Sequence, residues 1–151
     1  MTKETLKEIV DHLYLESKEA YRNGEIPVAA ALVMDGKVFY SHNEVEKKND
    51  PFRHAEIEVI QKGLKESDSR YLKNNTLIVT LEPCLLCMGA ILKVGIENLY
   101  YILDDKKKGS LSYYHVFVDD VMKVHRIEDK RFEVLFTDFF SKMRGKEDES
   151  E

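Results

Sequence analysis

The chain has 151 residues, of which 43% are hydrophobic and 34% are charged, a composition typical of one soluble globular domain. It contains no apolar run of the roughly eighteen residues that a membrane-spanning helix requires, and its mixed-charge N-terminus lacks the apolar centre of a secretory signal. The formal net charge of −5 disfavours a nucleic-acid partner, although it is compatible with a local basic patch. We therefore expect a cytoplasmic protein without a membrane anchor.

The C-terminal segment 146–151 differs in composition from the rest of the chain. It contains one lysine and four acidic residues, which carry most of the net negative charge. Such a segment has few apolar side chains to bury. We expect one folded domain over residues 1–145, followed by an acidic, disordered tail over residues 146–151.

The first third of the chain predicts a helix followed by a β-hairpin. Apolar side chains recur at helical spacing over residues 6–21. Asn23-Gly24 then ends the helix, because glycine readily adopts the left-handed conformation found after helices. The apolar run over residues 28–34 predicts a buried strand. Asp35-Gly36 is typical of a two-residue hairpin turn, so residues 37–41 are expected to return as a second strand.

The remainder of the chain alternates between helical and strand patterns. Asp50-Pro51 is typical of a helix start, because aspartate accepts hydrogen bonds from free amides and proline fits the first helical position. This helix is expected to span residues 52–64. Similar patterns predict strands over residues 76–80, 99–103 and 121–127, and helices over residues 83–94 and 131–144. Residues 104–120 show no clear pattern. The alternation without a repeat indicates an α/β domain with layers packed around a central sheet.

The only two cysteines, Cys84 and Cys87, stand three positions apart directly after Pro83. In a reducing compartment this spacing indicates a metal site or a redox pair. A second motif, His54-Ala55-Glu56, is common by chance when considered alone. Together, His-x-Glu followed by Pro-Cys-x-x-Cys is an established signature of zinc deaminases that act on nucleobases.

The residue types in these motifs suit a catalytic zinc site. Such a site uses three protein ligands and keeps a fourth position for water, and His54, Cys84 and Cys87 supply the three. Each ligand-bearing helix is expected to begin with a proline, which predicts ligands in first helical turns, where free amides favour the thiolate form. Glu56 lies about 200° further round the helix than His54. We therefore expect Glu56 to carry protons between the activated water and the substrate rather than to bind the ion.

Three other interpretations predict different behaviour. A thiol redox protein would form a reversible Cys84–Cys87 disulfide and ignore chelators. A structural zinc site would need a fourth ligand, and the chain has no third cysteine. A non-catalytic RNA-binding module would bind without turnover, which the presence of Glu56 disfavours.

Beyond these motifs, the sequence resembles the bacterial tRNA-specific adenosine deaminase (TadA) family over nearly its whole length. The resemblance implies a cytidine-deaminase-like, three-layer α/β/α sandwich with a central mixed sheet of about five strands. It also implies one zinc ion per chain, a homodimer, and conversion of adenosine to inosine at the wobble position of a tRNA anticodon. The segments that carry the resemblance are Gly24-Glu25-Ile26-Pro27-Val28, Asp50-Pro51, His54-Ala55-Glu56-Ile57, residues 76–84 with Cys87, Asp105-x-Lys107-x-Gly109 and Asp138-Phe139-Phe140.

The same resemblance assigns substrate contacts outside the metal core. It implies that Val28 and Asn43 hold the flipped base, and that Asp105, Lys107 and Phe139 lie along the anticodon loop. The chain departs from the family pattern at several positions near these contacts, among them Ala29, Phe52, Arg53 and Val124. A deaminase of a free base or nucleoside, such as guanine or cytosine, would keep the same metal core and is the alternative substrate class.

Overall fold

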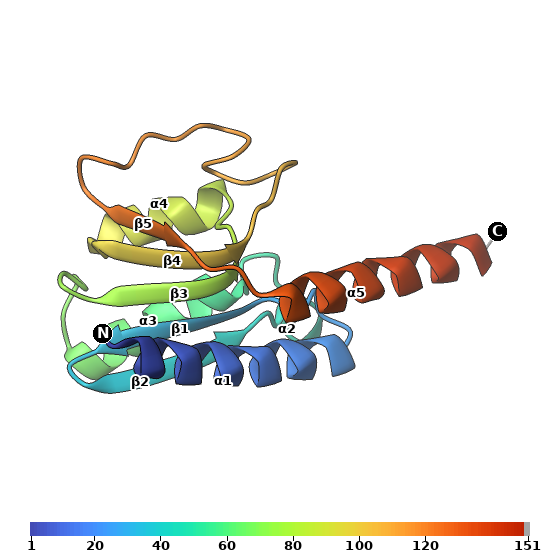
Figure 1. Cartoon of the computed structure of the whole chain (residues 1–151), viewed down its shortest axis with the longest axis horizontal. Coiled ribbons are helices and arrows are strands. Elements are labelled where there is room, and N and C mark those ends of the chain that lie inside the picture. The colour runs from blue at the N-terminus through green and yellow to red at the C-terminus, as the bar shows by residue number, and fades with distance from the viewer. Residues whose placement is uncertain (150–151) are drawn as a thin grey trace.

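The computed structural model describes residues 1–149 and is built around a five-stranded mixed sheet in the order β2-β1-β3-β4-β5 (Figure 1). The β1 strand is antiparallel to β2 and β3, whereas β3, β4 and β5 run parallel. The strands are β1 (Ala29–Met34), β2 (Lys37–His42), β3 (Thr76–Leu81), β4 (Asn98–Leu103) and β5 (Lys123–Arg126). Each of the five predicted strands is present, with ends shifted by no more than a few residues.

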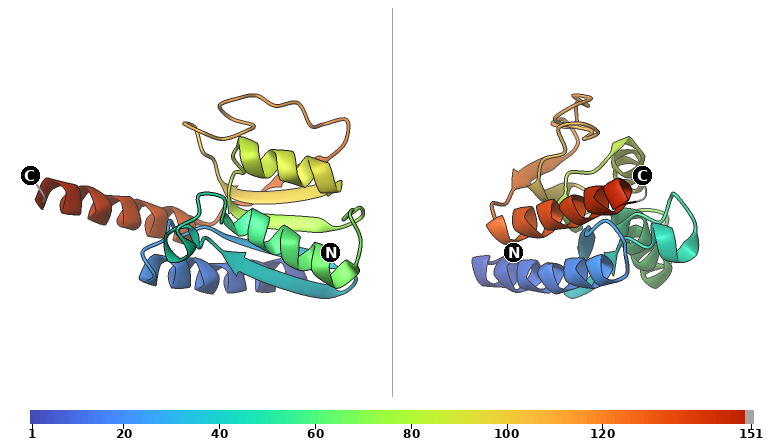
Figure 2. Two further views of the ribbon diagram at one scale, coloured as in Figure 1. Left: turned by 180° about the vertical axis from the view of Figure 1, so that it is seen from behind. Right: turned by 90° about the vertical axis from the view of Figure 1, so that its right-hand side faces the viewer.

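Helices cover both faces of the sheet. The helices α1 (Lys3–Arg22) and α5 (Lys130–Glu149) lie on one face, and α3 (Ala55–Ser67) and α4 (Leu85–Val94) lie on the other (Figure 2). Alternate residues of β1 enter two separate cores, since Ala31 packs with α1 whereas Leu32 packs with α3 and α4. Burial on both sides explains why β1 is continuously apolar. The three-layer α/β/α sandwich is confirmed.

Two turns confirm the expected role of glycine after a helix and in a hairpin. The α1 helix ends at Arg22 and is capped by Asn23, and Gly24 follows with φ +76°. Asp35 and Gly36 both have positive φ, 51° and 77°, as a two-residue turn between antiparallel strands requires.

The predicted start of the helix that follows Asp50-Pro51 is wrong by three residues. Asp50 Oδ1 accepts a hydrogen bond from the Phe52 amide and closes a local turn, and the chain is extended at His54 before α3 begins. The free amide of Ala55 instead donates to Asn43 Oδ1 at 2.8 Å. The cap is supplied from another part of the chain, so the local sequence pattern cannot locate it. His54 is consequently the residue that precedes the helix, rather than part of its first turn.

A short helix, α2 (Val45–Lys48), was not predicted. Four residues are too few for a periodic apolar pattern. The carboxylate of Glu25 accepts hydrogen bonds from the amides of Glu46 and Lys47, at 2.8 and 2.9 Å. A distant buried acid therefore satisfies the amides at the start of this helix.

The C-terminal helix α5 is longer than predicted. It continues past Arg144 to Glu149, so residues 146–149 of the predicted tail are helical, while residues 150–151 lie outside the described residues. Lysine and glutamate favour the helix, and Gly145 opposes it by only about 1 kcal/mol. The last turns of α5 extend beyond the edge of the sheet (Figure 1). The division between a domain over residues 1–145 and a tail remains a prediction. Within residues 1–149, no helix is long and apolar enough to cross a membrane.

Candidate active site

Four segments of the chain converge at one end of the strands of the sheet. The strand directions place the amino end of β1 beside the carboxyl ends of β2, β3 and β4. The residues just outside these strand ends include Val28, Asn43, Cys84 and Asp105. The topology thus brings together residues that are far apart in the sequence, at the end of the sheet where α/β proteins commonly bind ligands.

The three predicted metal ligands meet at this end of the sheet. His54 directly precedes α3, Cys84 directly precedes α4, and Cys87 lies in the first turn of α4. The Nδ1 atom of His54 is 3.7 Å from Cys84 Sγ and 3.4 Å from Cys87 Sγ. One ligand atom from each residue lies within 4.8 Å of the others.

The two nitrogen–sulfur distances fit a tetrahedral zinc ion. At the tetrahedral angle, zinc–sulfur bonds of about 2.3 Å and zinc–nitrogen bonds of about 2.0 Å place the sulfur and nitrogen atoms roughly 3.5 Å apart. The two observed distances, 3.4 and 3.7 Å, lie on either side of that value. Among the side chains described, those of residues 1–145, no other histidine, cysteine or acidic residue joins the group as a fourth ligand. The donor set is that of a catalytic site with an open position rather than a closed structural site.

The pKa values of the three ligands depend on the hydrogen bonds among them. A hydrogen bond from the Cys87 thiol lowers the pKa of Cys84 to about 4, whereas the same bond and burial raise the pKa of Cys87. The hydrogen bond with Cys84 raises the pKa of His54. These pKa directions favour one thiolate in the pair, on Cys84, with the Cys87 thiol as its donor. A metal ion would stabilise the second, because metal binding deprotonates thiols.

Glu56 is buried beside the ligands without belonging to their group. Its side chain is 4% exposed, and it lines the same cavity as His54 and Cys84. Burial raises the pKa of its carboxyl above the usual value. Because His54 precedes α3, the expected angular separation along a shared helix does not apply. A carboxyl group that is easily protonated and faces the cavity is suited to carrying a proton.

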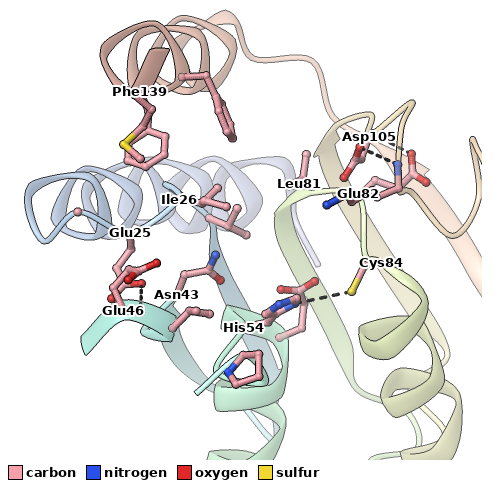
Figure 3. Close-up of a pocket in the computed structure, with 18 of the residues that line it drawn as sticks. Glu25, Ile26, Asn43, Glu46, His54, Leu81, Glu82, Cys84, Asp105 and Phe139 are labelled. Atoms are coloured by element: carbon pink, nitrogen blue, oxygen red, sulfur yellow. Dashed lines mark hydrogen bonds between the residues drawn. The ribbon is translucent and has the colours of Figure 1, made fainter. Parts of the chain in front are cut away.

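The cavity above these residues has a volume of about 640 Å³, within the usual range for small-molecule sites. Phe139 projects from α5 on one side, and Glu82 and Asp105 lie on another (Figure 3). Four of the five residues that the family resemblance assigned to the substrate line this cavity: Val28, Asn43, Asp105 and Phe139. The fifth, Lys107, lines a neighbouring cavity, and Lys108 lines the catalytic one instead.

Sequence reasoning missed two buried acids in the cavity wall. Glu25 and Glu82 are each 1% exposed, and each accepts hydrogen bonds from backbone amides of another segment. These amides lie about twenty to thirty positions further along the chain, so no local pattern could reveal the pairing.

Comparison with known proteins places the chain in a family. Residues 3–103 match the cytidine and deoxycytidylate deaminase zinc-binding region. A tRNA-specific adenosine deaminase from Aquifex aeolicus is 33% identical over 136 residues, which cover 86% of this chain and 90% of the relative.

Two solved structures are also similar. One comes from biochemical and structural studies of A-to-I editing by tRNA:A34 deaminases at the wobble position of transfer RNA. It has a TM-score of 0.76 and 32% identity, covering 82% of this chain and 99% of that one. The guanine deaminase of Bacillus subtilis has a TM-score of 0.61 and 30% identity, covering 69% of this chain and 66% of that one.

The fold and the three-ligand site define a zinc-type deaminase. The chain belongs to the cytidine and deoxycytidylate deaminase family and, within it, to the tRNA-specific adenosine deaminases.

Proposed function

We propose that this protein converts adenosine to inosine at the wobble position of a tRNA anticodon. The observation that carries the proposal is the group of His54, Cys84 and Cys87 with Glu56 buried beside it, at the base of one large cavity. This group occurs in a chain that matches a tRNA-specific adenosine deaminase over 90% of that relative's length. We assign one zinc ion per chain to the three ligands.

The buried carboxylate of Glu56 carries out the proton transfers of the reaction. Zinc, when bound, supplies an activated water molecule at its open position. Glu56 accepts a proton from this water and delivers it to the ring nitrogen next to the reacting carbon. The oxygen then bonds to that carbon, and Glu56 accepts the second proton of the water from this oxygen. Glu56 passes that proton to the amine as the carbon–nitrogen bond breaks. Adenosine and water thereby become inosine and ammonia.

The cavity wall supplies the contacts to the substrate. We assign Val28 and Asn43 to the flipped base, because both line the cavity at the amino end of β1 and the carboxyl end of β2. Asp105, Lys107 and Phe139 are assigned to the nucleotides on either side. The open cavity and the exposed lysines beyond Asp105 suit a polynucleotide whose phosphates remain outside the pocket.

Incubation of the zinc-loaded enzyme with total tRNA tests the proposal directly. We expect inosine in tRNA, identified by nucleoside analysis, and little turnover of free adenine, guanine or cytosine in parallel reactions. The similarity to a guanine deaminase makes guanine the informative alternative. Vigorous turnover of a free base with no inosine in any tRNA would assign the alternative function.

Replacing Lys107 with alanine is expected to weaken tRNA binding and its dependence on salt. Each phosphate contact to a single strand contributes about 0.7 to the slope of log affinity against log salt, so the variant should lose about that amount. Fluorescence anisotropy over a salt series measures the slope, and elemental analysis should find the zinc content unchanged. Lys65→Ala, at an exposed position late in α3, is the matched control. An unchanged slope in Lys107→Ala would remove this contact.

We also propose that the protein is a cytoplasmic homodimer. Three large apolar side chains of α4, Leu85, Leu86 and Leu92, are exposed on the single chain. Burial of such a set in a symmetric contact would remove apolar area from water. The tRNA substrate is consistent with a cytoplasmic location.

A further inference from the structure

Glu82 lies in the wall of the catalytic cavity, between the end of β3 and the metal ligand Cys84. It is 1% exposed, and no lysine, arginine or histidine side chain of residues 1–145 forms an ion pair with it. An isolated buried carboxylate is strongly unfavourable unless hydrogen bonds compensate it. The cost of burying the Glu82 carboxylate must therefore be offset by the groups that donate hydrogen bonds to it.

All of these donors belong to the loop that follows β4. Glu82 Oε1 accepts from the Asp105 amide at 3.2 Å and from the Ser112 hydroxyl. Glu82 Oε2 accepts from the amides of Leu111 and Ser112, each at 2.9 Å. The segment from residue 105 to residue 112, here called the rim loop, thus wraps around one carboxylate (Figure 3 shows Glu82 beside Asp105).

The rim loop also closes onto the turn that carries the metal ligand. Gly109 forms an isolated β-bridge with Cys84, and Ser110 donates to the Pro83 carbonyl from its amide at 3.0 Å and its hydroxyl at 2.6 Å. A methyl group on Gly109 would overlap with Glu82 Oε2 and with the carbonyl of Asp105. Glycine is thus required here by the close approach of the loop to Glu82.

The rim loop presents the side chains that face the substrate. Asp105 and Lys108 line the catalytic cavity, and Lys107 lines the neighbouring one. The amides of Lys107 and Lys108 donate to Asp105 Oδ1, at 3.2 and 3.1 Å, so these residues form one compact turn. Glu56, in contrast, is part of α3 and does not depend on this loop.

We infer that Glu82 is a positioning residue that holds the rim loop in the conformation that binds the polynucleotide substrate. This inference rests on the proposed function. Glu82 acts through Asp105 and the neighbouring lysines, and it neither binds the metal nor moves a proton. Loss of the interaction should therefore raise the KM for tRNA and leave kcat per bound zinc nearly unchanged. A residue that only stabilised the fold would instead reduce the active fraction at constant KM.

The substitution Gly109→Ala is the sharpest test, because it displaces the rim loop from Glu82 without replacing Glu82 or a metal ligand. Because Gly109 also forms a bridge with Cys84, the zinc content of the variant is measured alongside its kinetics. Steady-state kinetics of the zinc-loaded enzyme on tRNA should show KM raised about tenfold or more, since hydrogen bonds to a charged group are lost. The kcat per zinc should remain within about twofold of the wild-type value. The matched control is Gly145→Ala on α5, where an added methyl group has no neighbour within 4 Å and KM should not change.

Two further variants keep the test informative if Gly109→Ala does not fold. Glu82→Gln places an amide group against backbone amides and should also raise KM about tenfold or more. Ser112→Ala, at an exposed residue, removes one donor of four and should raise KM about threefold. Direct binding of tRNA to both variants, in a Glu56→Ala background that prevents turnover, should weaken in the same order.

The possible outcomes separate this inference from the proposed function. If the wild-type enzyme makes no inosine in tRNA, the proposed function fails before any variant is compared. If the wild-type enzyme makes inosine and these variants keep a normal KM, or lose zinc in proportion to activity, the role of Glu82 is overturned and the function stands.

Discussion

Replacement of Cys87 by serine is expected to abolish zinc binding and to lower the melting temperature on the order of 10 °C. Cys87 is fully buried in the first turn of α4, and it lies 3.4 Å from His54 Nδ1. A serine hydroxyl is a poor zinc ligand, so two donors would remain. Because the metal binds only the folded state, its loss removes the stability that binding contributes. Elemental analysis and thermal unfolding measure the two effects.

Met88→Leu provides the matched control for this prediction. Met88 is the next residue of α4 and is equally buried, but its side chain belongs to the apolar core rather than to the ligand group. A swap that conserves volume costs less than about 1.5 kcal/mol, so this variant should keep its zinc. A chelator should lower the melting temperature of the wild-type protein toward that of Cys87→Ser. A wild-type protein without zinc, or one whose cysteines form a reversible disulfide and which ignores chelators, would contradict the metal assignment and favour a redox pair.

The metal ligands could be identified from sequence because their geometry is mostly local. Cys84 and Cys87 are held together by one helix start, and His54 and Glu56 by another. The continuous apolar run of β1 similarly indicates burial on both faces, which the structure confirms. Short-range spacing carries this information without knowledge of the remaining fold.

Features that depend on distant partners could not be predicted in this way. The start of α3 is set by Asn43, twelve residues before Ala55, so the local Asp50-Pro51 signal was misleading. The conformation of the rim loop could not be predicted, because backbone amides of the loop donate to the distant Glu82 and the loop sequence itself shows no helical or strand pattern. The placement of Lys108, rather than Lys107, in the catalytic cavity follows from this loop and from no feature of the lysines themselves.

Replacement of Glu56 by glutamine is expected to reduce deamination by at least about two orders of magnitude while the zinc remains bound. Glutamine has the size of glutamate but cannot transfer a proton, and Glu56 does not belong to the ligand group. The melting temperature should stay the same or rise, because burial of the Glu56 carboxyl raises its pKa and the neutral amide avoids the cost of burying a charge.

Glu58→Gln is the matched control, since Glu58 lies one half-turn further along α3 and forms ion pairs with Arg53 and Lys48 outside the cavity. It should retain nearly full turnover. Single-turnover assays on tRNA, normalised to zinc content, separate the chemical step from binding. Near-normal turnover in Glu56→Gln would exclude this carboxylate as the proton carrier, whereas loss of zinc in the same variant would show that it supports the metal instead.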